Sequence, residues 1–150
     1  MVSSAYESQR QWDMYLILPH SADVSPARDC ADCHPLFYQT VEDRKVTLEN
    51  VMAIAKGQMT VIAHVACNNT KDSAELARHA EHLGVDAIAS IPPIYFHLPE
   101  YAIAAYWNDI SAAAPNTDFV IYNIPQLAGS ALTMSLFEEM RKNPRVVAVK

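Results

Sequence analysis

Short runs of apolar, β-branched residues recur along most of this chain, and an amphipathic segment separates each run from the next. The runs cover residues 60–66, 86–91, 119–123 and 146–150. Their starts recur roughly every 30 residues, which is the length of one strand plus one helix. Both the odd and the even positions of these runs are mostly apolar, and successive side chains of a strand point to opposite faces. Both faces of the predicted strands are therefore expected to be buried. This pattern predicts an α/β protein with a parallel sheet covered by helices.

The amphipathic segments between these runs predict helices. Thr40 is a suitable N-cap for the first helix and Gly57 follows its last turn, while Gly84 follows the second helix. Pro99 suits the first turn of the third helix. The four predicted helices span about residues 41–56, 70–83, 99–114 and 133–142. A doubly wound sheet and a TIM barrel share this alternation of strands and helices, and periodicity leaves the choice between them open.

Residues 1 to about 36 do not share this alternation. They hold one strand-like run at 14–18, followed by a polar stretch with three prolines at 19–35 that is unlike a helix. The pattern therefore predicts a regular body that follows an irregular N-terminal segment.

The composition argues against several classes of function. The formal net charge is −6 and the 11 lysines and arginines are scattered, so no nucleic-acid or anionic-membrane partner is expected. No apolar run approaches the roughly 20 residues of a membrane-spanning helix, and no signal peptide is expected. With three glycines and no Gly-x-Gly-x-x-Gly motif, a nucleotide site has no support. Three cysteines without a disulfide pattern predict a reduced, cytoplasmic protein.

The carboxyl ends of parallel strands are where reactive groups gather in α/β proteins. Lys150 ends a strand of four apolar residues. In such low-dielectric surroundings a lysine has a lowered pKa, and its neutral amine can attack a ketone. The alternatives are a lysine that extends to the surface at the end of a strand and a lysine that is simply the last residue of the chain.

Three more residues follow predicted strands or lie at their ends. Tyr122 can relay a proton beside a Schiff base, or it can be an ordinary tyrosine of a half-buried strand. Tyr95 follows two prolines in a loop that can reach the same carboxyl ends of the strands or a neighbouring subunit. His64 comes from a strand that is apolar on both sides, and we expect a core histidine with its hydrogen bonds satisfied.

Two segments resemble the paired motifs of the N-acetylneuraminate lyase and dihydrodipicolinate synthase superfamily. Residues 121–125 read Ile-Tyr-Asn-Ile-Pro, and residues 146–150 read Val-Val-Ala-Val-Lys. In that family the tyrosine of Tyr-Asn-x-Pro and a lysine 28 positions later form the catalytic pair, and Tyr122 and Lys150 have this separation. The resemblance covers residues 39–150, about three quarters of the chain. It includes residues 63–67 and 92–95.

The resemblance implies a (β/α)8 TIM barrel. Residues 37–150 are expected to form a partial barrel of the class I aldolase type, with about strands 2 or 3 to 6 and the intervening helices. Residues 1–36 are expected to be a divergent or irregular segment. Members of the family are commonly tetramers, so a homo-oligomer is implied.

The residues after the motif proline resemble one branch of the family. Dihydrodipicolinate synthases usually carry Arg-Thr there, whereas residues 126–129 read Gln-Leu-Ala-Gly, as in sialic acid lyases. The resemblance implies a Schiff-base aldolase that cleaves N-acetylneuraminate to pyruvate and N-acetylmannosamine. Lys150 would form the imine, Tyr122 would shuttle the proton, and Tyr95 would help to close the site. No metal or organic cofactor is implied. The alternatives are another pyruvate-dependent aldolase of the superfamily and an inactive truncated fragment of such an enzyme.

One segment departs from the family. A loop of glycines and hydroxyl residues holds the pyruvate carboxylate in the family, and its counterpart here is residues 30–35, where Asp32 would repel a carboxylate. The sequence also stops at Lys150, before the last two strands and the sugar-binding residues that they carry in the family. A gene product that is frameshifted or mis-started before about residue 37 explains the abrupt change, and a genuine variant is the alternative.

The divergent segment carries a rival signal. Cys30, Cys33 and His34 form a Cys-x-x-Cys-His motif, which marks covalent haem attachment in exported proteins. The same residues are suitable zinc ligands, but no fourth ligand is evident nearby. Without a signal peptide or cytochrome-like helices around it, the motif is weak support for either group.

Overall fold

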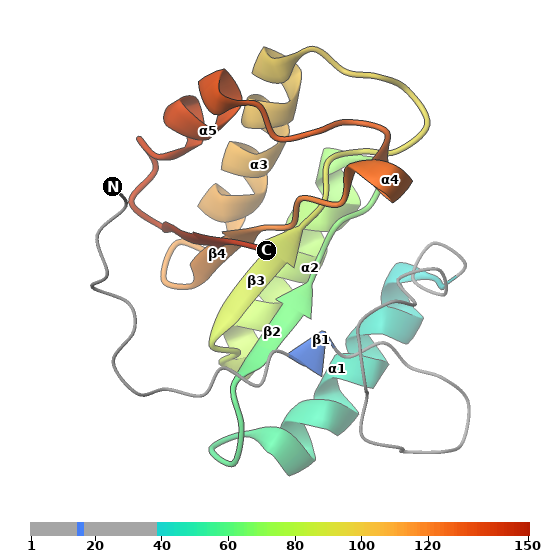
Figure 1. Cartoon of the computed structure of the whole chain (residues 1–150). Helices are drawn as coiled ribbons and strands as arrows, with labels where there is room; N and C mark the ends of the chain where they lie inside the picture. The colour runs from blue at the N-terminus through green and yellow to red at the C-terminus, as the bar shows by residue number, and fades with distance from the viewer. Residues whose placement is uncertain (1–14, 17–38) are drawn as a thin grey trace.

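The computed structural model of the chain describes residues 15–16 and 39–150 (Figure 1). Strands and helices alternate along the chain. The elements are β1 (Tyr15–Leu16), α1 (Val41–Ala55), β2 (Val61–His64), α2 (Thr70–Leu83), β3 (Ala87–Ser90), α3 (Glu100–Ala113), β4 (Asp118–Ile121), α4 (Pro125–Ala128), α5 (Met134–Met140) and β5 (Val146–Val149). Within the described residues, no helix combines the length and apolar character that crossing a membrane requires.

Capping residues mark the start of α1 and both ends of α2. Thr40 and Asp43 form a capping box at the start of α1, in which each side chain accepts a hydrogen bond from the backbone of the other. The side chain of Asn69 caps α2. Gly84 ends α2 in the left-handed conformation, with φ of 77°. These ends confirm the predicted start of α1 and the predicted limits of α2.

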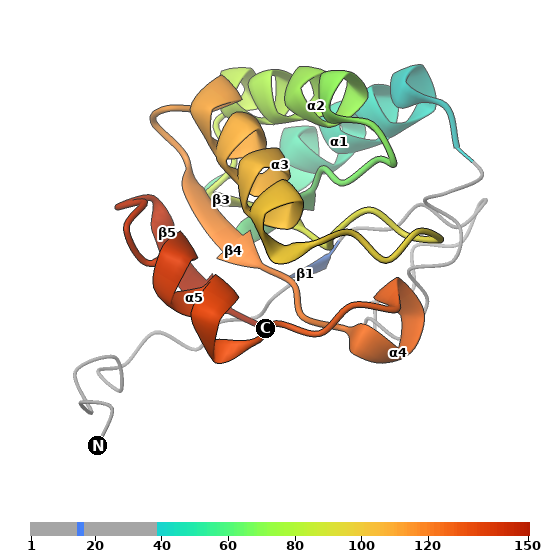
Figure 2. The ribbon, with the colours of Figure 1, turned by 90° about the horizontal axis from the view of Figure 1, so that it is seen from above.

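The five strands of the described sheet are parallel and adjacent in chain order, from β1 to β5. One apolar cluster joins α1, α2, α3 and α5 to one face of the sheet, and its most enclosed side chains include Trp107, Ile110, Ile88 and Phe119. Figure 2 shows α1, α2 and α3 together above the strands. The opposite face carries a smaller cluster that includes Ile62, Ala89, Val120 and Tyr122.

This arrangement decides between the two predicted architectures. A doubly wound sheet has helices on both faces, whereas here α1, α2, α3 and α5 all pack on one face and strand order follows the chain. The described chain is therefore part of a TIM barrel, and the small cluster lies on the face that corresponds to the barrel interior. The fold prediction is confirmed.

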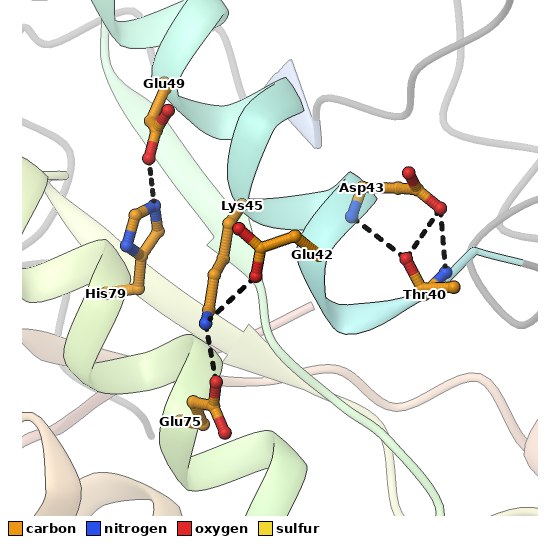
Figure 3. A network of polar contacts seen from close by, with 7 residues as sticks. All are labelled: Thr40, Glu42, Asp43, Lys45, Glu49, Glu75 and His79. Carbon is orange, nitrogen blue, oxygen red and sulfur yellow. Dashed lines mark hydrogen bonds and ion pairs between the residues drawn. The ribbon is translucent and has the colours of Figure 1, made fainter.

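Ion pairs join α1 to α2 on the outer surface of the barrel (Figure 3). Lys45 Nζ lies 2.5 Å from Glu75 Oε1 and 3.5 Å from Glu42 Oε2, and His79 Nε2 lies 3.3 Å from Glu49 Oε1. The carboxylates of these contacts are exposed to solvent, and such surface pairs contribute roughly 0–1 kcal/mol each, so the apolar contacts beneath them supply most of the stability of the α1–α2 interface.

Two features of the fold differ from the sequence-based expectation. The last strand, β5, is largely exposed rather than buried on both faces, with Val149 42% exposed, because β4 is its only strand neighbour in the described sheet. A short helix, α4, follows the Tyr-Asn-x-Pro motif and was not predicted. Pro125 begins this helix and Gly129 ends it with φ of 70°, so its limits follow ordinary capping rules over only one turn.

Candidate active site at the ends of β4 and β5

Tyr122 and Lys150 lie side by side just beyond the ends of β4 and β5. The backbone ladder continues through them, because the Lys150 N–H donates to the Ile121 carbonyl at 2.9 Å and the Asn123 N–H donates to the Lys150 carbonyl at 2.9 Å. The ammonium nitrogen of Lys150 lies 4.7 Å from the centroid of the Tyr122 ring. This register brings together the two residues that the sequence motifs single out.

Tyr122 is 4% exposed and belongs to the small cluster on the interior face of the sheet. Its backbone N–H donates to the Ser90 carbonyl at 3.1 Å, so β3 fixes it from one side while the Lys150 ladder holds it from the other. The ring of His64 meets the Tyr122 ring edge-on, with centroids 6.0 Å apart and an interplanar angle of 86°. The phenol is thus held in a defined orientation beside the amine.

His64 is a polar group of this interior face that the sequence-based interpretation undervalued. Both ring nitrogens are buried, and neither has a hydrogen-bond partner among the described residues. Burial, and then the charges of Arg44 and Lys150, lower the pKa of His64 to about 3, so the imidazole is neutral at pH 7. The burial of His64 agrees with the expected core position, and the expected hydrogen bonds of its nitrogens stay a prediction.

Arg44 holds the carboxyl end of β2 and was not predicted as part of the site. Its guanidinium donates to the carbonyls of His64 at 2.7 Å and Ala66 at 2.9 Å, and to the Sγ atom of Cys67 at 3.1 Å. Burial lowers the pKa of Arg44, and burial raises the pKa of the Cys67 thiol against the opposing effect of Arg44. Nothing in the sequence around Arg44 distinguishes it from a surface arginine of an amphipathic helix.

Lys150 is exposed among the described residues. Within the described sheet, β5 has β4 on one side only and its own residues are largely exposed, and the expected low-dielectric surroundings of Lys150 stay a prediction. The Tyr122 ring is the apolar surface that the structure places against the Lys150 amine.

Tyr95 lies apart from this pair. It is 86% exposed, its φ is +85°, and its ring meets that of Phe96 edge-on at 4.8 Å. A positive φ is costly for a bulky residue, on the order of 1–3 kcal/mol. Tyr95 and Phe96 line a groove of about 610 Å³ together with Tyr101 and Asn68.

The described ranges contain no cluster of His, Cys, Asp and Glu suited to a metal ion. The Cys-x-x-Cys-His motif and the counterpart of the carboxylate loop, residues 30–35, both lie outside the described residues.

Comparison with known proteins agrees with this geometry. Residues 36–150 match the model of the dihydrodipicolinate synthetase family. The chain is 82% identical over 114 residues to an N-acetylneuraminate lyase of Mediterraneibacter gnavus, covering 76% of this chain and 36% of that protein. The solved structure of wild-type sialic acid aldolase from Ruminococcus gnavus is 81% identical, with a TM-score of 0.75, over 77% of this chain and 38% of the other.

A second solved structure, a catalytic lysine mutant of the same aldolase, has the same TM-score of 0.75 and identity of 81%, and covers 76% of this chain and 37% of that one. The chain thus spans a little over a third of the length of these relatives. The family match covers the whole regular body of the chain, including Tyr122 and Lys150. The chain belongs to the dihydrodipicolinate synthetase family.

Proposed function

We propose that this chain carries the imine-forming part of an N-acetylneuraminate lyase, with Lys150 as the nucleophile and Tyr122 as the proton relay. The observation that supports this most directly is the 4.7 Å between the Lys150 nitrogen and the Tyr122 ring. The N-acetylneuraminate lyase that is 82% identical over the same region supports the choice of substrate. The related aldolase studied as a catalytic lysine mutant supports the role of a lysine.

The proposed reaction proceeds through an imine. The neutral Lys150 amine attacks the ketone carbon of N-acetylneuraminate in its open-chain form, and loss of water gives the imine. Tyr122 passes a proton between its phenol and the substrate oxygens as these bonds form and break. The electron pair of the broken carbon–carbon bond moves to the imine, which leaves an enamine of pyruvate and releases N-acetylmannosamine. Protonation of the enamine and hydrolysis of the imine then release pyruvate and the free amine.

The neutral His64 fits this proposed chemistry. A protonated His64 would favour the neutral form of the Lys150 amine through its positive charge. It would also be a second proton donor inside the barrel, in competition with Tyr122. With its pKa near 3, His64 leaves the amine and the phenol as the groups that exchange protons at neutral pH. The edge-on contact between the His64 and Tyr122 rings supports the phenol in its orientation.

Three further parts of the proposal rest on the family resemblance. Residues 37–150 are proposed to form one partial barrel unit, and residues 1–36 a separate divergent segment. Tyr95 is proposed to help close a keto-acid site, in its own subunit or in a neighbouring one. The exposed aromatic groove around Tyr95, Phe96 and Tyr101 supports assembly as a homo-oligomer, with a tetramer as the proposed state. The proposed location is the cytoplasm.

A borohydride trap tests the proposal directly. The purified chain is incubated with pyruvate and reduced with borohydride, and any adduct is mapped by mass spectrometry. We expect a reduced pyruvyl group on Lys150, and release of pyruvate from N-acetylneuraminate in a separate assay. An adduct spread evenly over exposed lysines such as Lys71 and Lys142 would contradict the proposed role of Lys150.

A further inference from the structure

The loop between β3 and α3 holds Tyr95 in an unusual backbone conformation. Tyr95 is the one described non-glycine residue with a positive φ, at +85°. Its ring and that of Phe96 are both exposed, so side-chain burial does not hold them in place. Such a conformation persists where the surrounding structure fixes the backbone. The question is therefore which group fixes this loop.

Asn68 supplies that group from the neighbouring loop between β2 and α2. Its Oδ1 atom accepts a hydrogen bond from the backbone N–H of Ile94 at 3.0 Å, directly before Tyr95. In the described structure this is the hydrogen bond that connects the segment 92–98 to the rest of the chain. Asn68 and Tyr95 also line the same groove.

The backbone on either side of Asn68 is itself firmly held. The N–H of Cys67 donates to Ser73 Oγ at 2.8 Å, and the Cys67 carbonyl accepts from the Tyr106 hydroxyl at 2.8 Å. Ser73 and Tyr106 are buried and come from α2 and α3. On the other side, Asn69 caps α2 by accepting from the Asp72 N–H at 2.8 Å. Asn68 thus extends from a fixed point toward a loop whose Ile94 and Leu98 side chains pack against the two apolar clusters, while Tyr95 and Phe96 between them are exposed.

We propose that Asn68 is a positioning residue, whose Oδ1 atom holds the Ile94 N–H and thereby keeps Tyr95 in its left-handed conformation and presents the phenol in the groove. The functional part of this inference rests on the proposed role of Tyr95 in closing a keto-acid site. The Ile94 N–H has no other partner among the described residues, so loss of the Asn68 acceptor leaves this exposed amide to solvent and frees the loop to open.

Two variants separate the acceptor from the rest of the side chain. Asn68→Asp keeps an oxygen at the Oδ1 position, whereas Asn68→Leu keeps a similar volume without an acceptor. Chymotrypsin cleavage after Tyr95 and Phe96, measured on the full chain under native conditions, reports opening of the loop. We expect Asn68→Leu to raise the cleavage rate about tenfold, the effect of losing one good hydrogen bond, and Asn68→Asp to stay within about twofold of the parent chain.

The backbone amide protons give a second measurement that needs no variant. In the parent chain, the Ile94 amide is expected to exchange with solvent at least about tenfold more slowly than the Phe96 amide, which has no acceptor in the described structure. Equal exchange at Ile94 and Phe96, or equal cleavage of Asn68→Leu and the parent chain, would overturn the positioning role even if one variant folds poorly.

The borohydride trap tests the functional part. Asn68→Leu is expected to slow pyruvate trapping in the same direction as Tyr95→Ala, and Asn68→Asp to restore the parent rate. Normal trapping by Asn68→Leu together with accelerated cleavage would overturn the link to function while leaving the loop contact intact. Absence of trapping in the parent chain would count against the proposed function alone, because cleavage and amide exchange still report on Asn68.

Discussion

The amine of Lys150 lies 4.7 Å from the centre of the Tyr122 ring, and the Lys150 backbone N–H bonds to the carbonyl of the residue before Tyr122. Two residues that are 28 positions apart in the sequence thereby become neighbours through the register of two adjacent parallel strands. Because the Lys150 amine lies over the face of the Tyr122 ring, Tyr122 can act on it through the ring as well as through the hydroxyl. The two contributions of Tyr122 can therefore be tested separately.

Replacing Tyr122 by Phe removes the hydroxyl and keeps the ring beneath the amine. We expect the rate of pyruvate trapping to fall by roughly 10²–10⁴, the usual contribution of a positioned acid–base group. The free energy of unfolding is expected to change by less than about 1.5 kcal/mol, because the buried ring remains. His82→Gln, at an exposed position of α2 that does not line the groove around Tyr95, is the control. Equal loss of trapping in both variants would contradict the role of Tyr122.

Replacing Lys150 by Ala removes the proposed nucleophile. We expect no pyruvyl adduct at this position and no turnover of N-acetylneuraminate, because the replacement has no amine for imine formation. Lys142→Ala serves as the control, since Lys142 is an exposed lysine that pairs with Glu139. Adduct formation elsewhere in Lys150→Ala at the rate of the parent chain would show that trapping does not report on this site.

The buried His64 predicts a loss of stability in mild acid. Its pKa is about 3 in the folded chain and 6.5 in the unfolded chain, so the unfolded state binds the extra proton between these values. As the pH falls from 6.5 toward 3, His64 lowers the free energy of unfolding by up to about 1.4 kcal/mol per pH unit. The effect is absent above pH 6.5 and levels off below pH 3.

Urea unfolding at pH 7 and pH 5 measures this dependence. His64→Phe keeps a ring against Tyr122 and cannot be protonated, so its stability is expected to fall less between the two pH values than that of the parent chain. His82→Gln, at an exposed position of α2, is the control and is expected to follow the parent chain. A parent-like pH dependence in His64→Phe would contradict the assignment.

Replacing Arg44 by Met removes the clamp on the end of β2. The carbonyls of His64 and Ala66 lose their guanidinium partner, and we expect the free energy of unfolding to fall by about 2–4 kcal/mol. Thermal and urea unfolding measure the change. Arg141→Met, at an exposed arginine beside Phe137, is expected to cost less than about 1 kcal/mol. If Arg44→Met also lowered the free energy of unfolding by less than about 1 kcal/mol, water would have replaced the hydrogen bonds of Arg44.

Two glycines with nearly the same backbone angle separate conformational strain from crowding. Gly57 has φ of 78° with open space around it, whereas an added Cβ at Gly84, with φ of 77°, would lie 2.8 Å from Lys56 Nζ. Gly57→Ala is expected to cost about 1 kcal/mol from the left-handed backbone alone. Gly84→Ala is expected to cost more, since Lys56 also loses its bond to the Leu83 carbonyl. Equal melting temperatures for the two variants would contradict an added cost from the close contact between the new Cβ and Lys56.

The regular body of the chain was predictable because its signals are local. Capping by Thr40, the glycine after α2 and the alternation of strands and helices each depend on a few neighbouring residues. The helix α4 escaped prediction because a single turn has no periodicity to detect. The exposure of β5 escaped because an apolar run indicates burial without showing how many neighbours are present to bury it.

The sequence alone predicted the alternation of strands and helices and the parallel sheet from local periodicity and caps, and the family resemblance paired Tyr122 with Lys150, whereas the short helix α4 was not predicted. The tertiary structure was needed to show that the helices pack on one face of the sheet and that Arg44 is buried against the end of β2. It was also needed to show that neither nitrogen of His64 has a partner among the described residues and that Asn68 accepts a hydrogen bond from the Ile94 N–H. The physical reason is that burial and hydrogen bonding are properties of side chains brought together by the packing of distant segments, and the identity of a residue does not specify which groups will surround it.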